Sequence, residues 1–285
     1  MARTYNDLFL DIRNNLSKHD IETSNFDARY IVCFASGKSN AEFVRDMSLY
    51  ASPEIEEKAL SMMQRRINGE PLAYVTGAWE FHGLPFFITK DVLIPRIDTE
   101  VMVDAAIELL RSTPTPRVLD LCCGSGCIGI AIAKQIPQSK IISVDISGAA
   151  LQICRKNVNL NKLNSRVICM QADAKQSPPR GMGSYDMIVC NPPYIPSKEI
   201  GSLDHSVKDF EPVWALDGGP SGMDFYQAII TQWSSLLKTG GHILFEVGEH
   251  QSREVLQLLK DASFQNFSIK KDTINVERVI IAEKI

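Results

Sequence analysis

The sequence lacks two features that would assign it to a membrane or to export. No apolar run among its 285 residues approaches the roughly 20 residues that a membrane-spanning helix needs. The first turns contain Asp7 and Asp11, whereas secretory signals and organellar transit peptides avoid acidic residues. We therefore expect a soluble, cytoplasmic protein that does not contact a membrane.

The sequence also lacks a paired cysteine motif and a long basic run. Its seven cysteines are odd in number and mostly lie in apolar surroundings, so we expect reduced core thiols and no metal site. The formal net charge of −4 gives no support for direct nucleic-acid binding, although an acidic chain can use a local basic patch. The 45% apolar fraction is ample for a packed core.

The first 72 residues have the pattern of helices. Leu8, Ile12 and Leu16 recur every four residues, and no β-rich run interrupts the segment. It carries 9 basic and 11 acidic residues, which is more typical of a small recognition bundle than of a phosphate-binding arm. We predict that residues 1–72 form a helical substrate-recognition domain, with a plain packing domain as the alternative.

The pattern changes between residues 73 and 95. Short aromatic and β-branched runs at residues 74–76 and 86–88 are separated by glycine and proline, which predicts a β-hairpin linker over 73–95. Residues 98–100 then offer an N-cap and a first-turn acid for a helix that runs to Leu110.

From residue 96 onward, apolar strands alternate with helical stretches. Strands are expected at residues 117–121, 140–144, 166–170, 185–190, 242–247 and 276–282. Strands separated by helices favour an α/β fold with a doubly wound, mainly parallel sheet and right-handed crossovers. We predict that residues 96–285 form the catalytic domain.

The first of these strands is followed by a glycine-rich segment. Gly124, Gly126 and Gly129 match the G-x-G-x-x-G dinucleotide fingerprint, and Asp145 lies 21 residues beyond Gly124, where a ribose-binding acid is expected. NAD would fit this pattern. However, Asp120 lies where its carboxylate would repel a pyrophosphate, while S-adenosylmethionine brings an ammonium, a sulfonium and no phosphate. The sequence therefore favours S-adenosylmethionine.

Acidic residues end three successive strands of this region. Asp145 would hydrogen-bond both ribose hydroxyls, and Asp173 is placed to meet the exocyclic amine of adenine. Each has a structural alternative: Asp120 as a solvated strand-end charge, Asp145 as a helix cap and Asp173 as a turn former. Their common position at strand ends favours the binding site.

The most informative local feature is the turn Asn191-Pro192-Pro193-Tyr194, directly after the strand at 185–190. Two consecutive prolines remove two backbone donors and fix two φ angles, so the turn is rigid. A rigid turn at the carboxyl end of a strand can grip a planar amide or amine.

With this turn, the chain resembles the amino-methyltransferases that carry Asn/Asp-Pro-Pro-Tyr after the fourth strand and methylate adenine, guanine or glutamine amides. Wider motifs make it similar to the peptide chain release factor glutamine N5-methyltransferase family. These motifs are GEPLAYVTG at 69–77, EF at 80–81, VLIPR at 92–96, EP at 211–212, AL at 215–216, DFY at 224–226, GG at 240–241 and EVG at 246–248. The resemblance implies a Rossmann-like seven-stranded sheet with a small N-terminal helical domain.

The resemblance also implies the substrate and the site. The substrate would be the glutamine of the Gly-Gly-Gln loop in class 1 peptide chain release factors, with S-adenosylmethionine converted to S-adenosylhomocysteine. The implied cofactor residues are Cys122, Cys123, Gly124, Ser125, Gly126, Asp145 and Ala174, and the implied glutamine-binding residues are Asn191, Pro192, Pro193 and Tyr194. Ala174 departs from the family, which often has an aromatic residue there beside adenine.

An amide nitrogen is a poor nucleophile because its lone pair is delocalised, and the sequence offers no obvious general base. We therefore expect catalysis by orientation. The Asn191 side-chain oxygen and the Pro192 carbonyl would accept the two amide hydrogens, and Tyr194 would pack over the amide plane and exclude water.

Three alternatives stay open. An adenine-N6 nucleic-acid methyltransferase is the nearest, since the same turn can grip the amine of a flipped base. A cofactor-binding partner without catalysis and an NAD oxidoreductase are the others. Arg96 and Glu246 also lie in family-like motifs, and the sequence assigns them no chemical role beyond a loop anchor and a core-edge ion pair.

Overall fold

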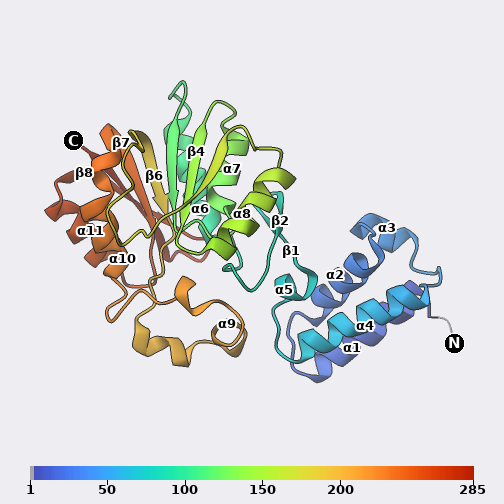
Figure 1. The fold of residues 1–285 in the computed structure, drawn as a ribbon. Helices are drawn as coiled ribbons and strands as arrows, with labels where there is room; N and C mark the ends of the chain where they lie inside the picture. The colour runs from blue at the N-terminus through green and yellow to red at the C-terminus, as the bar shows by residue number, and fades with distance from the viewer. Residues whose placement is uncertain (1–2) are drawn as a thin grey trace. The chain divides into compact units, whose positions relative to one another are not determined.

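The structure is a computed structural model that describes residues 3–285, and the chain divides into two compact units at Gly77 (Figure 1). The first unit is helical, as the sequence predicts. Leu8, Ile12 and Leu16 are fully buried. The helices are α1 (Tyr5–Lys18), α2 (Ser24–Ser36), α3 (Asn40–Arg45), α4 (Pro53–Ile67) and α5 (Leu72–Thr76).

Hydroxyl caps start three of these helices. Thr4, Ser39 and Ser52 each accept a hydrogen bond from a backbone N–H in the first turn of α1, α3 and α4, and Pro53 is the first residue of α4. Since α1 packs against both α2 and α4, its apolar face is buried inside the bundle.

Helix α5 corrects one expectation, because residues 74–76 form a helical turn and not a strand. Gly77, with φ of +71°, ends the turn. The Arg65 guanidinium of α4 donates to the carbonyls of Tyr74 and Val75 at 3.0 and 2.9 Å and pairs with Glu70. These tertiary contacts outweigh the strand propensity of aromatic and β-branched residues. The hairpin is shorter than predicted and comprises β1 (Ala78–Phe81) and β2 (Leu84–Phe87).

The second unit contains the predicted doubly wound sheet, with seven strands in the order β5-β4-β3-β6-β7-β9-β8. Neighbours from β5 to β7 are parallel, and β9 is antiparallel to both β7 and β8. The sequence did not indicate β8, a largely polar edge strand. The strands are β3 (Arg117–Leu121), β4 (Lys140–Asp145), β5 (Val167–Gln171), β6 (Tyr185–Cys190), β7 (Leu237–Glu246), β8 (Phe264–Lys271) and β9 (Glu277–Lys284).

Helices flank this sheet (Figure 1). Helix α6 packs against α7 and α7 against α8, while α10 packs against α11. No helix in the described part of the chain is long and apolar enough to cross a membrane. The helical segments are η1 (Ile97–Thr99), α6 (Glu100–Leu110), α7 (Cys127–Gln135), α8 (Gly148–Leu160), η2 (Ser197–Ser202), α9 (His205–Lys208), η3 (Val213–Ala215), α10 (Asp224–Gln232), η4 (Ser234–Leu236) and α11 (Ser252–Asp261).

The strand order reverses between β3 and β6. The chain proceeds from β3 outward to β4 and β5, then returns to place β6 on the other side of β3. The last residues of these two strands, Leu121 and Cys190, are directly paired. The segments that follow them, which begin with Cys122 and Asn191, therefore meet at the switch point where open α/β sheets bind ligands.

Candidate active site

A cavity of about 310 Å³ opens at this switch point. Its volume is at the lower end of the range for small-molecule sites, roughly 300 to 1,000 Å³. Both predicted parts of the site contribute to its wall. Of the predicted residues, those that line it are Cys122, Gly124, Asp145, Asp173, Ala174, Asn191 and Pro193.

The three glycines after β3 leave open space at one place and allow close packing at two. Gly124 has φ of +51° and leaves open space where a side chain would lie. A Cβ on Gly126 would lie 2.5 Å from the sulfur of Cys154, and one on Gly129 would lie 2.7 Å from Oδ2 of Asp120. The first glycine therefore leaves room beside the cavity, Gly126 lets the start of α7 approach α8, and Gly129 lets α7 approach the sheet.

The two acids at the ends of β4 and β5 line the cavity and also hold its loops. The two carboxylate oxygens of Asp145 accept the backbone N–H groups of Gly124 at 2.8 Å and Ser147 at 2.9 Å. Burial raises the pKa of Asp145. Asp173 accepts the N–H of Lys175 at 2.8 Å, as a turn former does. The structural interpretations of both residues are therefore correct, and their ligand-binding roles stay predictions.

Asp120 is a correction, because its side chain does not line the cavity. It is fully buried beneath α7, where Oδ2 accepts from the Gly129 N–H at 3.1 Å and from the Ser143 hydroxyl at 3.3 Å. Burial raises its pKa to about 7. The argument that Asp120 repels a pyrophosphate therefore fails. A residue at the end of a buried strand can point into the protein interior as well as into the cavity, and Asp120 points into the interior.

The turn after β6 is held by close backbone packing. A Cβ on Gly218 would lie 2.7 Å from Cα of Tyr194 and 2.8 Å from the carbonyl oxygen of Pro193. The Gln251 side chain donates to the Tyr194 carbonyl at 2.8 Å and accepts the Gly248 N–H at 2.9 Å. These contacts fix the turn beyond what its two prolines impose.

Comparisons with known proteins agree with this architecture. A family model described as the methyltransferase small domain matches residues 99–204, and one described as the PrmC N-terminal domain matches residues 7–77. The release factor glutamine methyltransferase of Clostridium botulinum is 34% identical over 278 residues, which cover 98% of each chain. The enzyme of the same name from Clostridium acetobutylicum is 38% identical over 80% of this chain and 82% of its own.

The chain belongs to the release factor glutamine methyltransferase family. It is therefore a methyltransferase, as its sequence predicted. Among solved structures, the hMettl16 catalytic domain in complex with a 3′UTR hairpin has a TM-score of 0.58 at 15% identity, covering 81% of this chain and 82% of that one. That likeness concerns the fold alone.

Ala174 lies where the resemblance led us to expect an aromatic residue, and the structure shows a ring close by. Ala174 is buried, and the Trp233 indole donates to its carbonyl at 3.0 Å. Phe225, the second residue of α10, lines the cavity and packs against the hydrophobic core cluster that contains Ala174 and Trp233. The Lys175 ammonium lies 5.1 Å from the centre of the Phe225 ring. Sequence reasoning noted the DFY motif but did not place Phe225 at the cavity.

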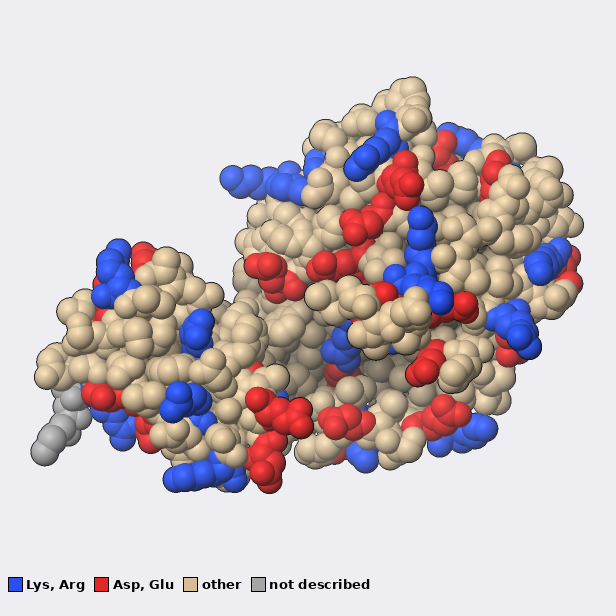
Figure 2. Space-filling model, turned by 180° about the vertical axis from the view of Figure 1, so that it is seen from behind, with Lys and Arg blue, Asp and Glu red and all other residues tan. Residues whose placement is uncertain are grey.

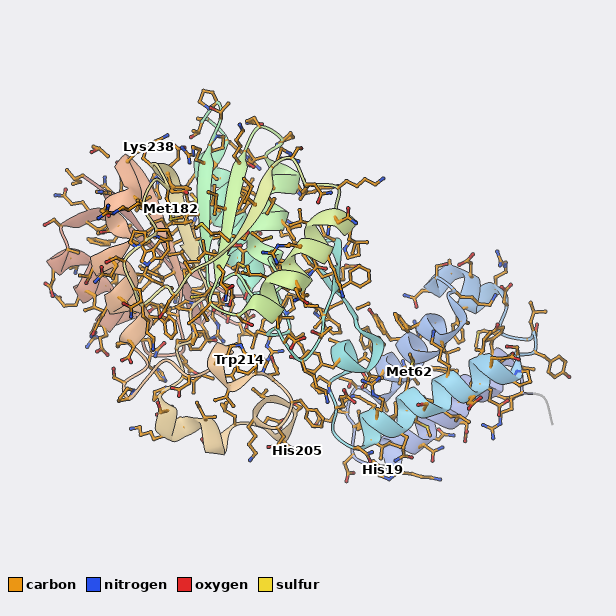
Figure 3. The ribbon with its side chains drawn as sticks, in the orientation of Figure 1. His19, Met62, Met182, His205, Trp214 and Lys238 are labelled. Atoms are coloured by element: carbon orange, nitrogen blue, oxygen red, sulfur yellow. The ribbon has the colours of Figure 1, made fainter. Side chains whose placement is uncertain are left out.

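Trp214 is a second cavity residue that sequence reasoning missed. It comes from η3, in the segment between α9 and α10, and is labelled in Figure 3. More than half of its side chain surface is exposed, at 55%. The neighbouring EP and AL motifs at residues 211–212 and 215–216 were the signals for this segment.

The remaining predicted residues do not line the cavity. Cys123, Ser125 and Pro192 are buried. Tyr194 is half-buried, and burial raises the pKa of its phenol to about 12. The predicted residues outside the lining are Asp120, Cys123, Ser125, Gly126, Pro192 and Tyr194. A larger groove of about 700 Å³ beside α11 contains none of the predicted residues.

Arg96 and Glu246, left without a role by the sequence, have different surroundings. The Arg96 guanidinium forms an ion pair with Glu211, which also accepts the Ile94 N–H at 3.2 Å, so Arg96 anchors the loop before η1. Glu246 is buried behind Asn191, and burial raises its pKa to about 7. It accepts the Thr99 hydroxyl at 2.6 Å. The sequence predicted an N-cap for α6 from residues 98–100. The Thr99 side chain makes no such capping hydrogen bond.

Proposed function

We propose that the protein transfers a methyl group from S-adenosylmethionine to the side-chain amide nitrogen of the Gly-Gly-Gln glutamine in class 1 peptide chain release factors, leaving S-adenosylhomocysteine. The observation that carries this proposal is one cavity lined by both Asp145 and Asn191. An acid suited to ribose hydroxyls and an amide suited to a planar NH₂ group thus face the same space.

The residues around the cavity fit the cofactor. Asp145 offers carboxylate oxygens for the ribose hydroxyls, and Asp173 can accept a hydrogen bond from the adenine amine. Ile146, Ala172 and Phe225 provide apolar surface for the ring. The open space at Gly124 lets a ligand approach the backbone. When bound, the cofactor supplies an electrophilic methyl group.

The turn orients the acceptor. We propose that the Asn191 side-chain oxygen and the Pro192 carbonyl accept the two hydrogens of the glutamine amide. The raised pKa of Tyr194 keeps its phenol neutral at pH 7, so Tyr194 serves as a packing surface and not as a base. Orientation of this kind supplies about 7 to 11 kcal/mol in well-aligned reactions.

The helical unit is a candidate for recognition of the protein substrate. We propose that residues 1–72 contact the release factor, since a free peptide containing Gly-Gly-Gln offers little surface for discrimination. The reaction would then take place in the cytoplasm, where translation ends. If residues 1–72 contact the release factor, we expect the KM for the intact release factor to be far below the KM for a short Gly-Gly-Gln peptide, while kcat is similar for both.

The charge on one face of the protein favours a protein substrate over nucleic acid. On the face in Figure 2, the described Lys and Arg side chains are interspersed with Asp and Glu and do not form a continuous basic stripe. Binding along a phosphate backbone depends on such a stripe.

The test uses methyl-labelled S-adenosylmethionine. The protein is incubated with a class 1 release factor, with the same factor carrying alanine in place of the Gly-Gly-Gln glutamine, and separately with duplex DNA. We expect label only in the unsubstituted release factor. Label in the DNA, or equal label in both release factors, would overturn the proposal.

A further inference from the structure

A buried polar chain lies directly behind Asn191. The Nδ2 atom of Asn191 is 3.4 Å from the Thr99 hydroxyl oxygen, and that hydroxyl donates to Oε2 of Glu246 at 2.6 Å. Thr99 is 2% exposed and Glu246 is 3% exposed, so water does not compete for these groups. Thr99 ends η1, Asn191 directly follows β6 and Glu246 ends β7.

The chemistry of this chain fixes a direction. An ionised carboxylate can only accept hydrogen bonds, so the Thr99 hydroxyl must donate to Glu246. The oxygen of Thr99 then accepts from the NH₂ group of Asn191. Asn191 also lowers the pKa of Glu246, as a donor near a carboxylate does. A reversed Asn191 amide would place its oxygen against two acceptors.

We propose that Thr99 and Glu246 are positioning residues that hold the NH₂ group of Asn191 inward and its oxygen toward the acceptor glutamine. This inference rests on the proposed function and assigns a task to two buried residues that do not line the cavity. The Asn191–Thr99 separation is long for a hydrogen bond, so the chain acts mainly by excluding the reversed amide.

The protonation state of Glu246 sets the direction in which the hydrogen bonds between Asn191, Thr99 and Glu246 are donated. A protonated Glu246 can donate to Thr99, whose hydroxyl is then free to donate to the Asn191 oxygen, and this favours the reversed amide. Burial raises the pKa of Glu246 to about 7, so we expect kcat to rise with pH through about 7 and then level off. The titratable and charged groups facing Glu246 are Arg278, Asp98, Tyr194, Cys127 and Tyr226.

The first test replaces the hydroxyl. Thr99→Val keeps the shape of the side chain, and we expect kcat to fall about 10- to 100-fold while S-adenosylhomocysteine affinity changes less than about threefold. Thr99→Ser restores the hydroxyl and should restore most of kcat. Thr231→Val is the matched control, since the Thr231 hydroxyl donates only within α10, to the Gln227 carbonyl at 2.7 Å.

The second test removes the ionisation. Glu246→Gln should lose the rise of kcat near pH 7, because the glutamine amide does not titrate. An unchanged pH profile in Glu246→Gln, wild-type kcat in Thr99→Val, or a Thr99→Ser variant as impaired as Thr99→Val would each overturn the inference.

A spectroscopic readout separates this inference from the proposed function. The side-chain ¹⁵N–¹H signals of Asn191 are assigned by their loss in Asn191→Ala, without any substrate. We expect slow exchange with water in the wild type and faster exchange in Thr99→Val. Equal exchange in both proteins would refute the positioning role, whereas a wild type that never methylates release factors would refute only the proposed function.

Discussion

The two sides of the cavity are built in different ways. On the cofactor side, the segment after β3 and Asp145 lie within one β-α-β unit, and the Gly124 N–H bonds directly to Asp145. On the proposed acceptor side, Asn191 contacts Thr99, whose hydroxyl donates to Glu246, while Gly218 and Gln251 pack against or bond to the following residues. The cofactor side is thus local in sequence, and the acceptor side is assembled from the whole unit.

Each side also buries one carboxyl group whose pKa burial raises to about 7, Asp120 beneath α7 and Glu246 behind the turn. Asp120 contacts the Gly129 backbone and Ser143, whereas Glu246 contacts Thr99 and, through it, Asn191. The difference predicts that substitutions on the cofactor side change affinity, while those on the acceptor side change turnover.

The largest expected effect is on the acceptor side. Asn191→Ala removes the oxygen that orients the glutamine amide, and we expect kcat to fall about 100- to 1,000-fold. S-adenosylhomocysteine affinity, measured by calorimetry, should change less than about threefold. Asn164→Ala is the control, because Asn164 bonds only to exposed Asn159. Equal loss of kcat and cofactor affinity would contradict the division between the two sides.

Gly218→Ala tests the packing that supports the turn. The new Cβ would meet backbone atoms of Tyr194 and Pro193 at 2.7 and 2.8 Å, and neither can move cheaply. We expect a kcat about 100-fold lower and a cost of about 1 to 3 kcal/mol in unfolding free energy. Thermal unfolding and turnover are measured beside Gly201→Ala, where a Cβ meets nothing within 4 Å. Wild-type behaviour of Gly218→Ala would show that the turn does not need this contact.

The sequence predicted much of the fold because its signals are local. The alternation of strands and helices, the three glycines and the two prolines are each visible in a short stretch of sequence. The structure confirms the sheet and places Asn191 and Gly124 in the wall of one cavity. The misses are tertiary. Hydrogen bonds from Arg65 stabilise the helical turn at residues 74–76. The Asp120 side chain points toward the face of β3 that α7 covers, and the sequence does not show which face that is. Phe225 reaches the cavity only through the packing of α10.

Asp145→Asn should give a moderate effect on the cofactor side. Both Asp145 oxygens accept backbone N–H groups. The substitution removes the negative charge and also places an amide NH₂ against one of these N–H donors. We expect S-adenosylhomocysteine affinity to fall about 10- to 30-fold, in the range of hydrogen bonds to charged groups. At saturating cofactor, kcat should stay within about threefold. Asp261→Asn, at an exposed position of α11, is the control. A kcat loss without an affinity loss would place Asp145 on the acceptor side.

The smallest effect tests whether Phe225 replaces the aromatic residue that Ala174 lacks. Phe225→Ala should weaken S-adenosylhomocysteine binding about 3- to 10-fold, since aromatic pairs contribute about 0.5 to 1.5 kcal/mol beyond their buried area. Phe267→Ala is the matched control, because Phe267 is also half-buried and has the Lys260 ammonium 5.8 Å from its ring centre. An Ala174→Trp substitution added to Phe225→Ala should recover the affinity if the two positions share one stacking surface. Failure of that double variant to bind better than Phe225→Ala would mean that Phe225 packs the core and leaves adenine to the apolar wall at Ile146.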